Sequence, residues 1–73
     1  MSLIYPVNIK QIEDYYLVTC RDIPELITEG VTFKHALYMA QEALIDSLNF
    51  YDEKEMDYPE PSAVQDGEFL VYI

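Results

Sequence analysis

The sequence contains few of the residues that hold a fold together covalently or through metal ions. Its 73 residues include one cysteine, one histidine, two glycines and no tryptophan. A single cysteine cannot form a disulfide within the chain, so disulfides do not hold the fold. No apolar run is long enough to be a signal peptide or to span a membrane. We therefore expect one small cytoplasmic domain with no membrane association.

Basic residues are scarce as well. Four lysine and arginine residues stand against fourteen acidic residues, and the formal net charge at pH 7 is −10. Such a charge repels phosphate backbones and anionic lipid headgroups, and it attracts cations and basic proteins. With 51% hydrophobic residues, the chain is nevertheless too apolar for a disordered acidic tail. The composition predicts a folded acidic domain that does not bind nucleic acid directly.

The longest periodic segment covers residues 32–54, where the apolar side chains fall on one stripe at about 100° per residue. The stripe consists of Phe33, Ala36, Leu37, Ala40, Leu44, Ser47, Leu48 and Tyr51. Thr32 can cap the helix start through its hydroxyl, although His35 stands where a capping box has Glu or Gln. We predict a helix that covers one face of a β-sheet, attached mainly through Leu37, Leu44 and Leu48.

Four segments have the features of β-strands. Residues 3–12 alternate between apolar and polar side chains, residues 15–21 are rich in aromatic and β-branched residues, residues 26–30 are short, and residues 68–73 close the chain. Pro6 has no amide proton, which favours an edge strand or the beginning of a strand. A right-handed crossover through the helix predicts that the last strand lies parallel to a neighbour. The order is β-β-β-α-β, an α+β fold.

Several short motifs share their spacing with one bacterial protein family. They are Tyr5-Pro6-Val7, Asp22-Ile23-Pro24, Thr28-Glu29-Gly30, the helix start at Thr32 with Ala36, Ala40, Ala43 and Leu44, and Pro59-Glu60-Pro61-Ser62. In this combination the chain resembles the HicB antitoxins and their single-domain relatives over nearly its whole length. It departs from the family pattern at Asp14-Tyr15, where a glycine-rich turn is usual, at Arg21 in place of a common proline, and at Glu25 in place of a common glycine. These differences should alter local loops rather than the fold.

The resemblance implies a partial ribonuclease H fold in which residues 1–73 form a single HicB-like domain. It also implies that the chain neutralises a small basic ribonuclease toxin of the HicA type, by covering the toxin's RNA-binding surface and catalytic histidine. Many family members carry a C-terminal DNA-binding domain, and we do not expect one within these 73 residues. Two alternatives stay open: a stand-alone HicB-like domain with another protein partner, and a metal-dependent nuclease.

Candidate catalytic residues are few. A ribonuclease H-type nuclease needs several carboxylates around a divalent metal ion, beginning on the first strand, and residues 3–12 contain no acid. Glu13 and Asp14 follow in a predicted hairpin turn, where solvated side chains are usual. His35 has no nucleophile or orienting partner near it in the sequence, and Cys20 alternates with strand positions expected to be buried. We therefore expect no catalytic residue, no metal site and no cofactor.

Two sets of residues are candidates for protein contacts. The partner-binding set is the acidic series Asp52, Glu53, Glu55, Asp57 and Glu60, for which the alternative is a solubilising connector. The small core of so short a chain predicts a homo-oligomer. The self-association set is Tyr5, Tyr38, Ile45 and Tyr72, for which the alternative is ordinary scattered exposure.

Overall fold

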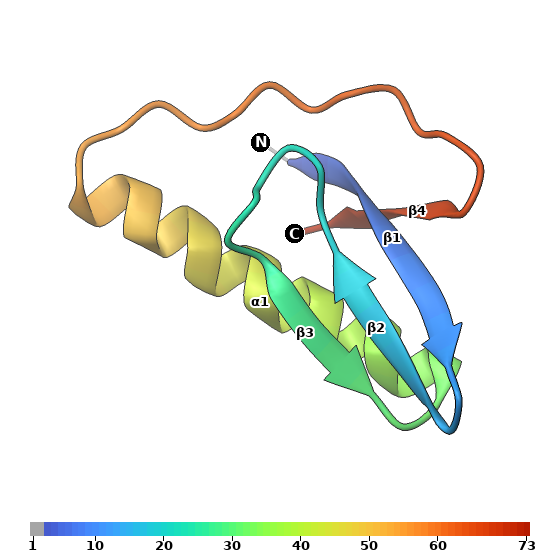
Figure 1. The fold of residues 1–73 in the computed structure, drawn as a ribbon. Coiled ribbons are helices and arrows are strands. Elements are labelled where there is room, and N and C mark those ends of the chain that lie inside the picture. The colour runs from blue at the N-terminus through green and yellow to red at the C-terminus, as the bar shows by residue number, and fades with distance from the viewer. Residues whose placement is uncertain (1–2) are drawn as a thin grey trace.

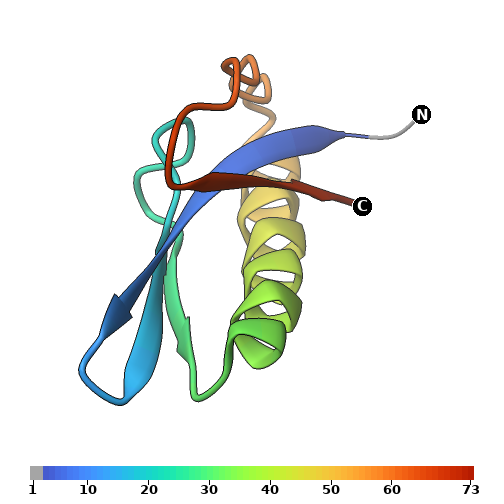
Figure 2. The same ribbon diagram turned by 90° about the vertical axis from the view of Figure 1, so that its right-hand side faces the viewer.

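The computed structural model describes residues 3–73 and confirms the β-β-β-α-β order and the α+β class. Its elements are β1 (Ile4–Ile12), β2 (Tyr15–Thr19), β3 (Ile27–Gly30), α1 (Phe33–Glu53) and β4 (Glu68–Tyr72). The strands form one antiparallel sheet in the order β3-β2-β1-β4. Helix α1 covers one face of this sheet, as Figures 1 and 2 show, so the described chain has two layers.

The alternation in β1 sorts its side chains between the two faces of the sheet. Tyr5, Val7 and Ile9 are buried in the core that the sheet shares with α1, while Lys10 is exposed. Ile9 lies opposite Val18 of β2, which is fully buried in the same core. One face therefore belongs to the core, as the period of two predicts.

The direction of β4 differs from the prediction of a parallel last strand, which is wrong. Strand β4 is antiparallel to β1, with Val71 opposite Tyr5 and Phe69 opposite Val7. The cause is the connector, residues 54–67, which runs back along the molecule after α1 (Figure 1). Strand β4 therefore starts opposite Asn8, in the middle of β1, and runs back towards Ile4, against the direction of β1.

Pro6 lies near the beginning of β1, which is one of the two places that its missing amide proton favours, although β1 is not an edge strand. Strand β1 lies between β2 and β4, but its last pair with β2 is Asn8 opposite Thr19, so Pro6 has only β4 beside it. The Pro6 carbonyl accepts a hydrogen bond from Cys20 Sγ at 3.5 Å. Since the N–H and C=O of one strand residue point to the same side, the amide side of Pro6 faces away from β4. The missing N–H therefore removes no hydrogen bond from the ladder.

Helix α1 begins as the sequence predicts, with Thr32 as its cap. Thr32 Oγ1 accepts a hydrogen bond from the His35 amide at 3.0 Å. Nδ1 of His35 in turn accepts from the Val31 amide at 3.2 Å. The imidazole thus takes the place of the capping-box carboxylate and satisfies an amide one residue further out. His35 has a structural role at the helix start.

The predicted apolar stripe of α1 faces the sheet. Its buried members are Ala36, Ala40, Leu44, Leu48 and Tyr51. Leu37 is half-buried at the margin of the core, so it contributes less to the attachment than predicted. Ile23 and Leu26, from the turn between β2 and β3, complete the core beside the helix. Ala36 and Ala40 have no exposed surface, and their small side chains allow the helix to lie close to the sheet.

Candidate partner-binding surface

The connector between α1 and β4, residues 54–67, has no helix or strand of its own. It includes three of the five residues of the predicted partner-binding set. Buried backbone groups in such a segment need partners from outside it. Three anchors supply contacts of this kind, and they come from β1 and from the turn between β2 and β3.

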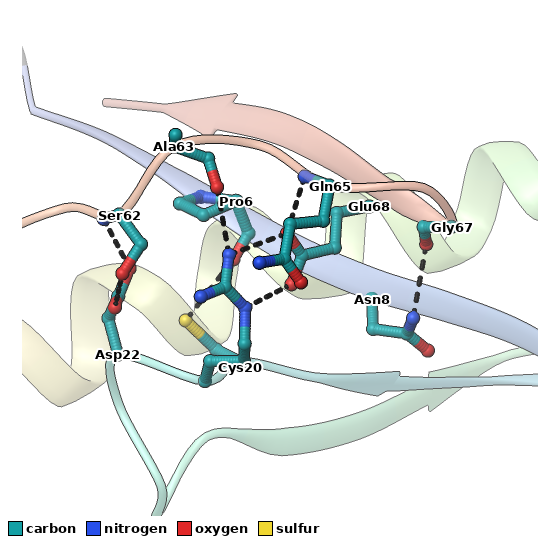
Figure 3. A network of polar contacts seen from close by, with 10 residues as sticks. Pro6, Asn8, Cys20, Asp22, Ser62, Ala63, Gln65, Gly67 and Glu68 are labelled. Atoms are coloured by element: carbon teal, nitrogen blue, oxygen red, sulfur yellow. Dashed lines mark hydrogen bonds and ion pairs between the residues drawn. The ribbon is translucent and has the colours of Figure 1, made fainter.

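The first anchor joins Asp22 to Ser62. Ser62 donates its amide, at 2.9 Å, and its hydroxyl to the two oxygens of the Asp22 carboxylate, and Figure 3 shows the two residues facing each other. Asp22 precedes a tight turn in which the Leu26 amide donates to the Ile23 carbonyl at 2.9 Å. Pro24 occupies the second position of that turn, for which its fixed φ is suited. The turn therefore positions the carboxylate that holds the connector.

The second anchor is Arg21, the neighbour of Asp22. Its guanidinium donates two hydrogen bonds to the Glu68 carboxylate, at 2.7 and 2.9 Å, and one to the Ala63 carbonyl at 2.8 Å. The Glu68 side chain is only 5% exposed, and the hydrogen bond from Arg21 lowers the pKa of Glu68 below its ordinary 4.5. The stability that this pair supplies is present above pH 4.5 and is lost as the pH falls through the lowered pKa.

The third anchor is Tyr5, whose hydroxyl donates to the Pro59 carbonyl at 2.7 Å. Burial raises the pKa of the Tyr5 phenol, and the charge of Asp22 adds to the rise, so the hydroxyl stays protonated as a donor. The sequence placed Tyr5 in the self-association set. Because its side chain has no exposed surface, that prediction is wrong for Tyr5. Its ring belongs to the core and its hydroxyl holds the connector.

The anchored connector keeps the predicted acids at the surface. Exposed side chains are found at all five positions of the partner-binding set: Asp52, Glu53, Glu55, Asp57 and Glu60. Tyr58 donates to both oxygens of the Asp52 carboxylate, at 2.7 and 2.8 Å, which folds the start of the connector back on the end of α1. The last turn of α1 has no basic residue to offset the negative end of the helix dipole. The local field is therefore negative.

Apolar side chains are interleaved with these acids. Met56, Tyr58 and Val64 are 48%, 37% and 48% exposed. Protein interfaces combine an apolar centre with a polar rim, and charged groups at the rim speed the encounter of the partners. An anchored segment with both kinds of side chain can contact a basic protein surface.

The remaining members of the self-association set lie on two different elements. Tyr38 and Ile45 belong to α1, where Tyr38 is 58% exposed and Ile45 is half-buried. Tyr72 belongs to β4 and is 64% exposed. These residues do not form one set with Tyr5, which is in the core.

The other candidates from the sequence are in the places predicted for them. Glu13 and Asp14 are exposed in the turn between β1 and β2, where Glu13 has a φ of 54°. Cys20 is a buried free thiol, and burial raises its pKa. Within residues 3–73, no three His, Cys, Asp or Glu side chains come together in a way that could hold a metal ion. Nor does this part of the chain contain a helix with the length and apolar character needed to cross a membrane.

The polar anchors of the connector were not predicted from the sequence. Arg21 is 47 residues away from Glu68 and 42 from Ala63 in the sequence, and Asp22 is 40 residues away from Ser62. No local sequence pattern links residues that are so far apart. The available signal was the composition, because Arg21 is one of only four basic residues among fourteen acids. A scarce cation next to a turn carboxylate was a candidate for a structural ion pair.

The sequence is similar to those of a known protein family and of several bacterial proteins. The family described as "HicB_like antitoxin of bacterial toxin-antitoxin system" matches residues 4–73. Antitoxin HicB 2 of Photorhabdus laumondii is 43% identical over 58 residues, which cover 80% of this chain and 42% of that protein. Antitoxin HicB of Escherichia coli K12 is 33% identical over 70 residues, covering 94% of this chain and 51% of that protein. The chain thus spans about half, or less, of the length of these relatives.

Two solved structures have a similar fold. One is described as the HicA3 and HicB3 toxin-antitoxin complex, and a chain of it matches with a TM-score of 0.73 and 21% identity over 96% of this chain and 94% of that one. The other is the N-terminal domain of the Burkholderia pseudomallei antitoxin HicB, with a TM-score of 0.72 and 18% identity over 97% of this chain and 95% of that one. At these identities the likeness concerns the fold.

Proposed function

Because the chain belongs to the HicB-like antitoxin family of bacterial toxin–antitoxin systems, we propose that it binds and neutralises a small basic ribonuclease toxin of the HicA type in the cytoplasm. In this proposal the domain covers the RNA-binding and catalytic surface of the toxin. The observation that carries the proposal is the acidic connector, which is exposed and yet anchored to the fold at Asp22, Arg21 and Tyr5.

Charge brings the partners together in this proposal. Residues 42–60 contain seven acids and one lysine, a net charge of −6 out of the −10 of the whole chain. A basic toxin would be steered towards this region, and the on-rate would fall as salt screens the charges over about 8–10 Å at physiological ionic strength. The acids would also occupy the place that the phosphates of an RNA take on the toxin.

Anchoring reduces the entropic cost of binding. A free segment must be ordered when it binds, at about 0.5–1.5 kcal/mol for each immobilised side chain. The three anchors already fix the connector at Pro59, Ser62 and Ala63. The exposed apolar side chains between the acids would then be buried against the toxin and would set the residence time.

We propose no catalytic activity for this chain and no direct binding of nucleic acid. The nuclease alternative would have to use Glu13 and Asp14, which are exposed in a turn. The second alternative, a stand-alone HicB-like domain with another protein partner, uses the same surface. It differs in the partner, and the titration of toxin activity described in the Discussion separates the two.

Neutralising three connector acids should slow association with the toxin. We expect the variant Glu55→Gln, Asp57→Asn, Glu60→Gln to associate roughly tenfold more slowly at low salt, because local charge dominates steering. The matched control is Glu13→Gln, Asp14→Asn, Glu29→Gln, which removes three exposed charges on the β1–β2 turn and β3. Both variants change the net charge from −10 to −7. Stopped-flow association across about 0.05–0.5 M salt measures the difference.

Equal slowing of the two variants would mean that total charge, and not the connector, steers the toxin. Unchanged association of the connector variant at low salt would remove the connector from the interface. In either case the circular dichroism of both variants must first match that of the original chain.

A further inference from the structure

The sheet has two edge strands, β3 and β4, and β4 is the one that pairs with β1. Residues 67 and 73 bond towards β1, because the Ile9 amide donates to the Gly67 carbonyl at 3.4 Å and the Ile73 amide donates to the Leu3 carbonyl at 3.2 Å. Since successive strand residues point their N–H and C=O groups to opposite sides, Glu68, Leu70 and Tyr72 direct theirs outwards. Gln41 Nε2 confirms this, since it donates to the Tyr72 carbonyl at 3.0 Å.

Leu70 is the centre of this free edge. The Glu68 amide already donates to the Gln65 carbonyl at 3.0 Å, and the Tyr72 carbonyl is bonded to Gln41. Among the hydrogen bonds of residues 3–73, none uses the outward N–H or C=O of Leu70, the outward amide of Tyr72 or the outward carbonyl of Glu68. The four groups are arranged symmetrically about Leu70.

The edge has none of the usual protection against pairing. Natural edge strands are blocked by lysine, proline, bulges or inward charges, and β4, with the sequence EFLVY, has only Glu68. The charge of Glu68 is paired with Arg21. Leu70 and Tyr72 are 55% and 64% exposed, and with Leu37, Gln41 and Val71 they line a shallow groove between β4 and α1. A strand laid along this edge would cover apolar surface.

We propose that β4 pairs with β4 of a second copy of this chain, antiparallel and centred on Leu70. The two Leu70 residues would exchange both hydrogen bonds, and each Tyr72 amide would donate to the Glu68 carbonyl of the other copy. The pairing is two-fold and self-complementary, as a homodimer contact requires. It uses the four free groups and disturbs neither the Gln41 contact nor the Gln65 contact.

Charge favours a second copy over the basic toxin at this edge. The chain carries −10, so two copies approach most easily where their surfaces have least charge, and β4 is such a place because its one acid is neutralised by Arg21. In the proposed register Glu68 faces Tyr72 of the other copy, so the two glutamates are not opposed. A basic partner would be drawn to residues 42–60 instead. The dimer therefore does not depend on toxin binding.

The test is the mass of the isolated chain in solution, without toxin. Light scattering from micromolar to millimolar concentration should show a change from one chain to two. Leu70→Lys should weaken dimerisation roughly tenfold or more, because it places a cation on the edge and removes apolar contact. The control Ile27→Lys makes the same charge change on the opposite edge strand, where Ile27 is 66% exposed, and should leave dimerisation unchanged. Added salt should strengthen the dimer, whereas it should weaken toxin binding.

Amide exchange of the original chain gives a second readout that needs no variant. The Leu70 amide should become slower to exchange as concentration rises, while the Val71 amide, which faces β1, should be slow throughout. A constant mass of one chain over the whole range would overturn the proposal. So would a dimer that Leu70→Lys and Ile27→Lys weaken equally, or one in which exchange at Leu70 does not depend on concentration.

Discussion

Replacing Leu44 with alanine should lower the melting temperature of the domain by at least about 10 °C. Leu44 has no exposed surface and lies in the middle of the buried stripe of α1. Removing a fully buried leucine side chain costs about 2–5 kcal/mol, from lost transfer energy and from the cavity that remains. A domain of this size has a total stability on the order of 5–10 kcal/mol, so the loss is a large fraction of the whole. Thermal unfolding followed by circular dichroism measures it.

The control for Leu44 is Glu42→Ala on the exposed side of the same helix. This substitution should change the unfolding free energy by no more than about 0.5 kcal/mol. A Leu44→Ala variant that melts within a couple of degrees of the original chain would show that α1 does not pack on the sheet through this stripe.

Replacing Gly30 with alanine should destabilise the domain by roughly 2–4 kcal/mol, although it adds only one methyl group. Gly30 ends β3 just before α1, and a Cβ atom there would overlap the Ala36 amide nitrogen and lie 2.6 Å from the Ala36 Cα. Both are backbone atoms of the first turn of α1, so no side chain can rotate to make room. The helix start would have to move away from the sheet. Chemical denaturation gives the free energy of unfolding.

Glu29→Ala is the matched control for Gly30, because it changes the neighbouring residue of β3, which is exposed. It should leave the stability within about 0.5 kcal/mol of the original. If Gly30→Ala is as stable as this control, the close contact between β3 and the start of α1 does not exist in solution.

The local elements could be predicted from the sequence because their signals are local. The period of the stripe in α1 and the alternation in β1 both follow from which face meets the core, and Thr32 caps the helix through an amide three residues away. The β-β-β-α-β order followed in the same way. The acidic residues after the helix were expected to be exposed, and they are.

The direction of β4 could not be predicted, because it depends on the path of the connector and not on the helix before it. The composition of residues 54–67 identifies a connector but does not say where it leads. Pro6 was correctly expected near the beginning of a strand, but the sequence could not show that this strand lies inside the sheet. The rule that proline avoids central strands concerns the missing N–H, and here that side of β1 has no paired neighbour because β2 ends at Thr19.

The candidate site was predicted in part. A strand pattern does not distinguish an exposed tyrosine from a buried one, so Tyr5 was assigned to a surface contact. Its actual hydrogen-bond partner, the Pro59 carbonyl, lies 54 residues away in the sequence and could not be inferred from it. Arg21 stands where the resembling family commonly has proline, and the sequence indicated only a local difference. In the structure it joins three parts of the chain, since it contacts both Ala63 and Glu68.

The function that we propose for this acidic domain is the neutralisation of a basic ribonuclease toxin through a cover over its active surface. The most direct measurement is RNA cleavage by a purified HicA-type toxin from the same source, titrated with the domain. We predict that cleavage falls linearly with added domain and ends at one domain for each toxin, while the stability control Leu44→Ala inhibits less in proportion to its unfolded fraction. Undiminished cleavage at an excess of folded domain would contradict the account.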